Sequence, residues 1–169
     1  GARIVGVPLD SHGPTVAALS EAMAAAPVAL FIQPRAHNPT GAHMSRSRVK
    51  DIAKLVSGSR VVVVEDDHSG SASGVPLESV GAHAPANTLL IRSFSKSHGP
   101  DLRIAAIGGT AEVVHKITAR RQLGPSWTSR LIQTILLTML TDPRTEERVA
   151  AAADEYLMRR RSLAELLTT

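Results

Sequence analysis

Five short apolar runs recur along the chain without the polar alternation of a sheet that faces water on one side. They occupy residues 4–7, 28–32, 61–64, 89–91 and 104–107. Continuous apolar runs of this length, bounded by turn residues, are typical of strands that are buried on both faces. The pattern predicts an α/β fold in which these runs form the sheet.

The interval between the second and the third apolar run has the periodicity of a helix. Val49, Ile52 and Val56 recur at the spacing of one helix face, and Gly58 follows as a left-handed stop. A strand, a helix and a strand in this order predict a right-handed crossover between parallel neighbours. The interval 92–103 leaves no room for a crossover helix. The last two strands are therefore expected to be antiparallel neighbours or to be joined by an irregular loop, which makes the sheet mixed.

The end of the chain is predicted to be helical. One helix is expected at 111–123, and a second is expected to begin at a cap on Ser126 and to carry a broad apolar stripe up to Leu140. Asp142 and Pro143 place a cap and a proline in the order that opens a third helix. The helices and strands together predict a three-layer α/β/α arrangement with a mixed, mostly parallel sheet.

The chain of 169 residues has the length of about one domain. We predict that residues 1–143 form part of a large domain and that residues 144–169 form a helix leading toward a small domain outside the chain. Since an apolar run opens the sequence without a leader and the last helix has almost nothing after it, the chain is expected to be a piece of a longer protein.

The amino-acid composition argues against several classes of function. With two phenylalanines, one tryptophan and one tyrosine, the chain offers little for stacking on nucleobases, so nucleic-acid binding is expected only through a domain outside it. The absence of cysteine excludes disulfides and thiolate metal sites. No apolar stretch is long enough to span a bilayer, and the expected location is the cytoplasm. Trp127 and Tyr156 are expected on helices, in packing roles.

Polar residues gather after three of the predicted strands. The segments "QPRAHNPTG", "EDDHSG" and "SFSKSHGPDLR" follow Ile32, Val64 and Ile91. Ligands bind beyond the carboxyl ends of the strands in an open α/β sheet, so these segments are expected to converge. Together they offer an amine, carboxylates, an amide, hydroxyls and a guanidinium. A lysine that enters a closed site loses hydration, which favours its free amine and makes it a nucleophile toward carbonyl groups.

The ordered set of motifs carries a resemblance to a known family. "NPTG", the "EDD" segment, and "SFSK" followed seven residues later by an arginine resemble the large domain of fold type I pyridoxal-phosphate enzymes, the class I and II aminotransferases. Within that group the chain is most similar to the aminotransferase-like domain of MocR-type regulators of the GntR family. The resemblance extends over nearly the whole chain.

The resemblance implies roles for two catalytic residues. Lys96 would form a Schiff base with the aldehyde of pyridoxal phosphate and would move the proton at the substrate α-carbon. Asp66, rather than Asp67, would pair with the pyridine nitrogen, so that the ring can accept electron density. The implied reaction transfers an amino group between an amino acid and a 2-oxo acid.

The resemblance also implies the residues that hold the cofactor. Asn38 would hydrogen-bond the ring 3-oxygen, while Ser93, Ser95 and Arg103 would bind the phosphate, for which a forked guanidinium is suited. His68 stands where such enzymes commonly have a tyrosine near the 3-oxygen. An imidazole can donate the same hydrogen bond but differs in length and in titration range.

Two other functions compete with this reading. Glu65, Asp66, Asp67 and His68 could ligate a metal ion, but consecutive residues at a strand end point in alternating directions and cannot all converge on one ion. We therefore predict no metal site. The second is an effector-sensing domain of a MocR-type regulator, which would bind the cofactor and an amine without turnover.

The family's phosphate loop and the arginine that grips the substrate carboxylate have no counterpart within the chain. We therefore expect the chain to have little or no activity by itself. Its apolar helix faces are expected to need a partner surface, and a homodimer is predicted because sites in this family usually lie at a dimer interface.

Overall fold

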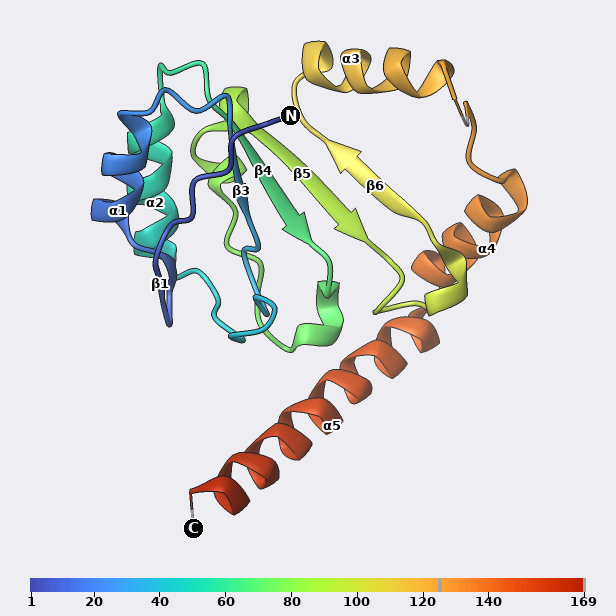
Figure 1. The fold of residues 1–169 in the computed structure, drawn as a ribbon. Helices are drawn as coiled ribbons and strands as arrows, with labels where there is room; N and C mark the ends of the chain where they lie inside the picture. Colours follow the sequence, from blue (N-terminus) through green and yellow to red (C-terminus); the bar gives the residue numbers. More distant parts are fainter. Residues whose placement is uncertain (125, 169) are drawn as a thin grey trace.

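The computed structural model describes residues 1–124 and 126–168, and its centre is a sheet of four strands. The strand order is β3 (Ala29–Ile32), β4 (Val62–Asp67), β5 (Thr88–Ser93) and β6 (Ala105–Gly108). β4 is parallel to β3 and to β5, whereas β6 is antiparallel to β5. The mixed, mostly parallel sheet is therefore confirmed (Figure 1).

Helices α1 (Val16–Met23) and α2 (Arg46–Val56) cover one face of this sheet (Figure 1). Ser45 caps α2 by accepting a hydrogen bond from the backbone N–H of Arg48, and Gly58 follows in a left-handed conformation with φ of 75°. The predicted helix and its parallel crossover are confirmed. The core between sheet and helices consists of Leu19, Ile32, Met44, Val49, Ile52, Ala53, Val56, Val63, Val80 and Ala84.

The strand predicted at 4–7 is wrong. β3 and β6 are the outer strands of the sheet, and residues 4–7 pair with neither of them. Ile4 is 92% exposed. A short antiparallel hairpin of β1 (Leu9–Asp10) and β2 (Gly13–Pro14) follows instead.

Two helices follow β6. α3 (Ala111–Gln122) is capped by Thr110, and α4 (Arg130–Thr141) is capped by Ser129, whose Oγ accepts from the backbone N–H of Ile132. The predicted cap on Ser126 is wrong, because Ser126 lies in an irregular segment before the helix begins. The helices themselves are confirmed.

The last helix, α5 (Pro143–Leu167), opens as predicted. Asp142 accepts a hydrogen bond from the backbone N–H of Arg144, and Pro143 occupies the first turn. The first half of α5 packs on the short 3₁₀ helix η1 (Gly70–Ser73), where Ala153 is buried. The rest of α5 extends away from the sheet (Figure 1).

Three further 3₁₀ turns join the strands: η2 (Val80–Ala82), η3 (Pro85–Asn87) and η4 (Pro100–Leu102). η2 is tied to the sheet by Glu65, whose fully buried carboxylate accepts from Ser79 Oγ at 2.5 Å and from the Val80 N–H at 2.6 Å. Burial raises the pKa of Glu65, although these hydrogen bonds act in the opposite direction.

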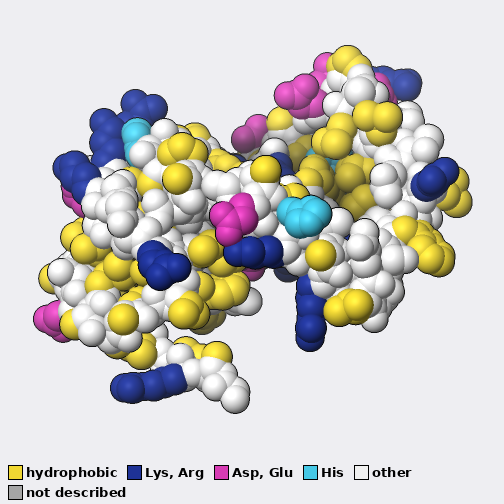
Figure 2. All heavy atoms as spheres, turned by 90° about the horizontal axis from the view of Figure 1, so that it is seen from above, with side chains coloured by type: hydrophobic (Ala, Val, Ile, Leu, Met, Phe, Trp, Pro, Cys, Tyr) yellow, Lys and Arg dark blue, Asp and Glu magenta, His cyan; other side chains and the backbone are white. Residues whose placement is uncertain are grey.

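Much apolar surface lies open around β6, α3 and α4. Every residue of β6 is exposed, α3 buries none of its described side chains, and α4 buries only Leu136 among those described. Seen from above, many hydrophobic side chains are visible at the surface between scattered charged groups (Figure 2). No helix in the described part of the chain combines the length and the apolar character needed to cross a membrane.

Candidate active site

The carboxyl ends of β3, β4 and β5 lie at one edge of the sheet because these strands are parallel. The three polar segments leave the sheet there, as predicted. Gln33 joins two of them: its Oε1 accepts from the backbone N–H of Asn38 at 2.9 Å, and its Nε2 donates to Asp66 Oδ2 at 3.4 Å. Asn38 precedes a cis peptide bond to Pro39. Asn38 and Asp66 are therefore brought together through one side chain.

The two aspartates at the end of β4 have different surroundings. Asp67 is completely buried, and its carboxylate accepts two hydrogen bonds of 2.8 Å from Arg35 and another from Arg92. Burial alone would raise the pKa of Asp67, but the two guanidinium groups hold it below its usual value. Asp66 points to the other face of the sheet, and Gln33 is the one described side chain that hydrogen-bonds its carboxylate. Asp66 is thus the carboxylate that stays available to a ligand.

The alternation along β4 also bears on the metal hypothesis. Glu65 and Asp67 lie on one face and are engaged by Ser79 and Arg35, while Asp66 lies on the other face. Within residues 1–124 and 126–168, no group of three or more histidine, aspartate or glutamate side chains is arranged to hold a metal ion.

His68 follows β4 directly and carries an orphaned polar atom. Its Nδ1 is buried and has no hydrogen-bond partner among the described residues, and the same holds for Ser69 Oγ. A buried polar atom without a partner costs about 1–3 kcal/mol. Orphaned buried atoms at the end of β4 call for a partner, which a ligand or a further part of the protein could supply.

The Lys96 segment is a tight turn anchored by Phe94. The Phe94 ring is buried and packs edge-on against His98 at 5.5 Å, and the His98 N–H donates to the Phe94 carbonyl at 2.9 Å. Burial, together with the charge of Arg92, lowers the pKa of His98. Lys96 itself is exposed. The expected closed environment is therefore not formed by the described residues alone.

The predicted phosphate-binding residues flank this turn. Ser93 ends β5, its Oγ accepts from the Ser95 N–H at 3.4 Å, and both serines are partly exposed. Arg103 is exposed and has φ of 46°, a left-handed conformation that is costly for a residue with a side chain. Because Ser93 pairs with Ala105 across the antiparallel strands, Arg103 returns to the same edge of the sheet.

A cavity of about 270 Å³ adjoins Lys96. The turn contributes Lys96 and His98 to its wall, and α5 contributes Arg148 and Tyr156. Tyr156, which the sequence assigned to packing, lines this cavity, and nothing in the sequence says which face of α5 meets the turn. Trp127 was expected on a helix but lies in the irregular segment before α4, where it is 80% exposed.

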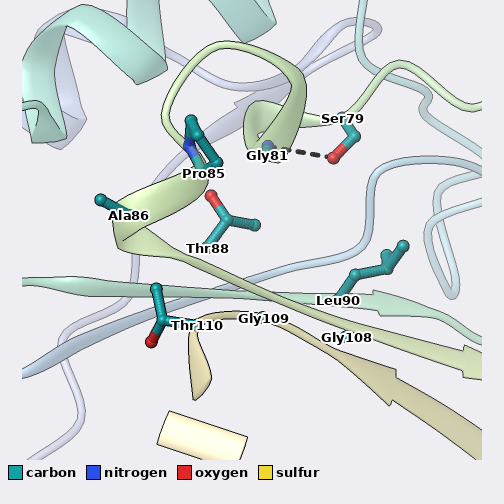
Figure 3. Close-up of a pocket in the computed structure, with 9 residues that line it drawn as sticks. All are labelled: Ser79, Gly81, Pro85, Ala86, Thr88, Leu90, Gly108, Gly109 and Thr110. Atoms are coloured by element: carbon teal, nitrogen blue, oxygen red, sulfur yellow. Dashed lines mark hydrogen bonds between the residues drawn. The ribbon is translucent and has the colours of Figure 1, made fainter. Parts of the chain in front are cut away.

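A second cavity of about 490 Å³ lies at the opposite end of β5 (Figure 3). It is lined by Ser79, Gly81, Pro85, Ala86, Thr88, Leu90, Gly108, Gly109 and Thr110. None of these side chains is ionisable. The ionisable side chains of the candidate site therefore lie at the carboxyl edge of the sheet, although the larger of the two cavities is at its other edge.

Comparison with known proteins gives the family. The family model described as aminotransferase class I and II matches residues 1–169. The chain therefore belongs to this family. It is 34% identical to the vitamin B6 salvage pathway transcriptional repressor PtsJ of Salmonella typhimurium over 95% of this chain and 38% of that protein.

Solved structures show the same architecture. The chain superimposes on the kynurenine aminotransferase of Pyrococcus horikoshii with a TM-score of 0.88 and 24% identity, over 97% of this chain and 43% of that one. LysN, the alpha-aminoadipate aminotransferase of Thermus thermophilus, gives a TM-score of 0.79 and 28% identity over 88% of this chain and 41% of that one. The predicted fold class is confirmed. The chain spans about two-fifths of the length of these relatives.

Proposed function

We propose that the chain carries the lysine-bearing part of the active site of an aminotransferase that uses pyridoxal phosphate to transfer an amino group between an amino acid and a 2-oxo acid. The meeting of an exposed amine, an available carboxylate and an imidazole whose Nδ1 has no hydrogen-bond partner among the described residues, all at one sheet edge, carries the proposal. LysN, solved in complex with N-(5'-phosphopyridoxyl)-L-leucine, supports a ligand of this type.

The residues around Asp66 fit the ring of the cofactor. The Asp66 carboxylate would accept a hydrogen bond from the pyridine nitrogen, and Asn38, tied to Asp66 through Gln33, would donate to the ring 3-oxygen. The orphaned Nδ1 of His68 would gain a partner in the same region. When bound, pyridoxal phosphate supplies an electron-poor ring that takes up the electron pair of the substrate α-carbon.

The turn after β5 fits the other end of the cofactor. The hydroxyl groups of Ser93 and Ser95 and the fork of Arg103 would hold the phosphate, since guanidinium groups bind phosphate through two parallel hydrogen bonds. The amine of Lys96, between these anchors, would hold the aldehyde end of the cofactor. As a free amine, the same group would take the proton from the substrate α-carbon and deliver it to the cofactor.

A homodimer completes the proposal. Large apolar side chains are exposed on both sides of α4 and along α5, and an exposed apolar surface of this kind marks a contact surface. The side chains concerned are Leu131, Ile135, Leu137, Leu140, Met158, Leu163, Leu166 and Leu167.

A second candidate function is the sensing domain of a regulator, in which cofactor and amine binding change conformation without turnover. The observation in its favour is the 34% identity to PtsJ, a transcriptional repressor. Both candidates need Lys96, Asp66 and Asn38, so the residues do not separate them.

Sustained turnover separates an enzyme from a sensor. We expect the full-length protein, loaded with pyridoxal phosphate and given a panel of amino acids with excess 2-oxoglutarate, to form glutamate over many turnovers, because the chain belongs to the family of class I and II aminotransferases. Glutamate is measured over time. Product limited to about one equivalent per subunit would contradict the aminotransferase and support the sensor.

The imidazole of His68 is open to a separate test. His68→Phe keeps a ring of similar size but removes the polar nitrogen. We expect it to weaken pyridoxal-phosphate binding by about 2- to 10-fold, the loss of one hydrogen bond. The dissociation constant is measured by absorbance titration of the full-length protein, with His115→Phe on exposed α3 as the matched control. Equal affinities of the His68 variant and the wild type would exclude a contact between His68 and the cofactor.

A further inference from the structure

One buried carboxylate connects all three segments of the candidate site. Asp67 ends β4 and is completely buried. Its Oδ1 accepts from Arg35 Nε at 2.8 Å and from the Gly70 N–H at 3.3 Å, and its Oδ2 accepts from Arg35 Nη2 at 2.8 Å and from Arg92 Nη1. Both oxygens are therefore fully used inside the protein. Asp67 has no capacity left for a ligand.

The partners of Asp67 come from the loop after β3 and from the end of β5. Arg35 lies in the loop that leads from β3 to Asn38, is 6% exposed, and also donates to the Val75 carbonyl at 2.7 Å. Arg92 lies on β5 directly before Ser93 and also donates to Ser71 Oγ at 3.1 Å. A displacement of the Asp67 carboxylate would therefore move the loop after β3 through Arg35 and the end of β5 through Arg92.

The packing around Arg92 shows how closely this cluster is fitted. Gly70 has φ of 61°, and a Cβ built there would lie 2.9 Å from Cζ of Arg92. Only glycine leaves room for the guanidinium at this point without displacing it. The Arg92 guanidinium also lies 5.9 Å from the centre of the Phe94 ring, the anchor of the Lys96 turn.

We infer that Asp67, with Arg35 and Arg92, is a positioning residue that sets the distance between the ring-binding side of the site, at Asn38 and Asp66, and the phosphate-binding turn at Ser93. The inference rests on the proposed function. A buried charge between two guanidinium groups resists displacement, since moving either partner leaves a charge without compensation. Such support around ligand-binding residues fixes their geometry to a fraction of an ångström.

The test compares Asp67→Asn with the wild type in the full-length protein. The amide has no charge. It also replaces one oxygen, which accepts hydrogen bonds from the guanidinium groups, with an NH₂ group that can only donate. We expect the dissociation constant of pyridoxal phosphate, measured by absorbance titration, to rise about 10-fold or more, as for other residues that orient ligand-binding side chains. Arg92→Lys keeps the charge but loses the forked second donor to Ser71 Oγ, and it is expected to lower the affinity less than Asp67→Asn does.

A double-mutant cycle separates positioning from loss of stability. If Asp67 acts by placing Asn38, the effects of Asp67→Asn and Asn38→Ala on cofactor affinity are expected to be non-additive. The control is Asp10→Asn. It breaks the ion pair in which Arg48 Nη2 lies 2.7 Å from Asp10 Oδ2, remote from the site. It is expected to change the melting temperature and leave the affinity unchanged.

Three outcomes decide the question. Non-additive losses of affinity support the inference. Additive losses, or a variant that melts earlier but binds normally, overturn it and leave the proposed function standing. A wild-type protein that gives no cofactor complex overturns the proposed function, and the inference with it.

Discussion

Lys96→Ala is expected to abolish the visible absorbance, at about 420 nm, that a lysine Schiff base with pyridoxal phosphate gives. The physical reason is that the bond requires a primary amine at the turn after β5, where the structure exposes Lys96. The variant also loses proton transfer by this amine, which is expected to lower the turnover number by about 10²- to 10⁴-fold. The measurements are the absorbance spectrum and the rate of glutamate formation by the full-length protein.

The matched control for this prediction is Lys50→Ala. Lys50 is an exposed lysine on α2, so the variant changes the net charge equally without touching the sheet edge. We expect its spectrum and rate to equal those of the wild type. An unchanged band in the Lys96 variant would show that another residue bonds the cofactor and would refute the assignment.

Asp66→Asn is expected to lower turnover by about 10²- to 10³-fold, the usual effect of removing a group that stabilises charge in the transition state. The amide retains the size of the side chain but not the negative charge that would keep the ring nitrogen protonated. Cofactor binding through Lys96 and the phosphate anchors is expected to persist. The turnover number and the spectrum are measured on the same preparation.

Asp51→Asn on α2 serves as the control, since Asp51 is a partly exposed carboxylate that only pairs with the neighbouring Lys54. Turnover within about 2-fold of the wild type in the Asp66 variant would assign the ring nitrogen to another group. The variant also distinguishes the two aspartates, because the expected effect at Asp67 is on affinity rather than on the chemical step.

The strands of the sheet were predictable because each contains a run of apolar residues bounded by turn residues, but burial on both faces does not account for all of them, since every residue of β6 is exposed. The runs at 28–32, 61–64, 89–91 and 104–107 correspond to β3, β4, β5 and β6 within a few residues. The run at 4–7 fails because a strand also needs a hydrogen-bonded neighbour, which composition cannot reveal.

The candidate site was predictable in its location but not in its internal connections. Parallel strands carry their following loops to one edge, so three polar segments after three apolar runs were enough to locate it. The cluster at Asp67 was missed, although an arginine placed beside each neighbouring strand end, at 35 and 92, is a signal that a buried carboxylate could have explained. The roles of the individual site residues stay predictions.

The antiparallel pairing of β5 and β6 has a consequence for variation among related sequences. Because Ser93 and Ala105 are paired through the main chain, the span of the connecting segment is fixed independently of its side chains. Point substitutions at exposed positions of this segment are therefore tolerable wherever neither a ligand nor the buried Phe94 ring is affected. An added or deleted residue would shift Arg103 relative to Ser93, so the length of this segment constrains the geometry of the edge more than most of its side chains do.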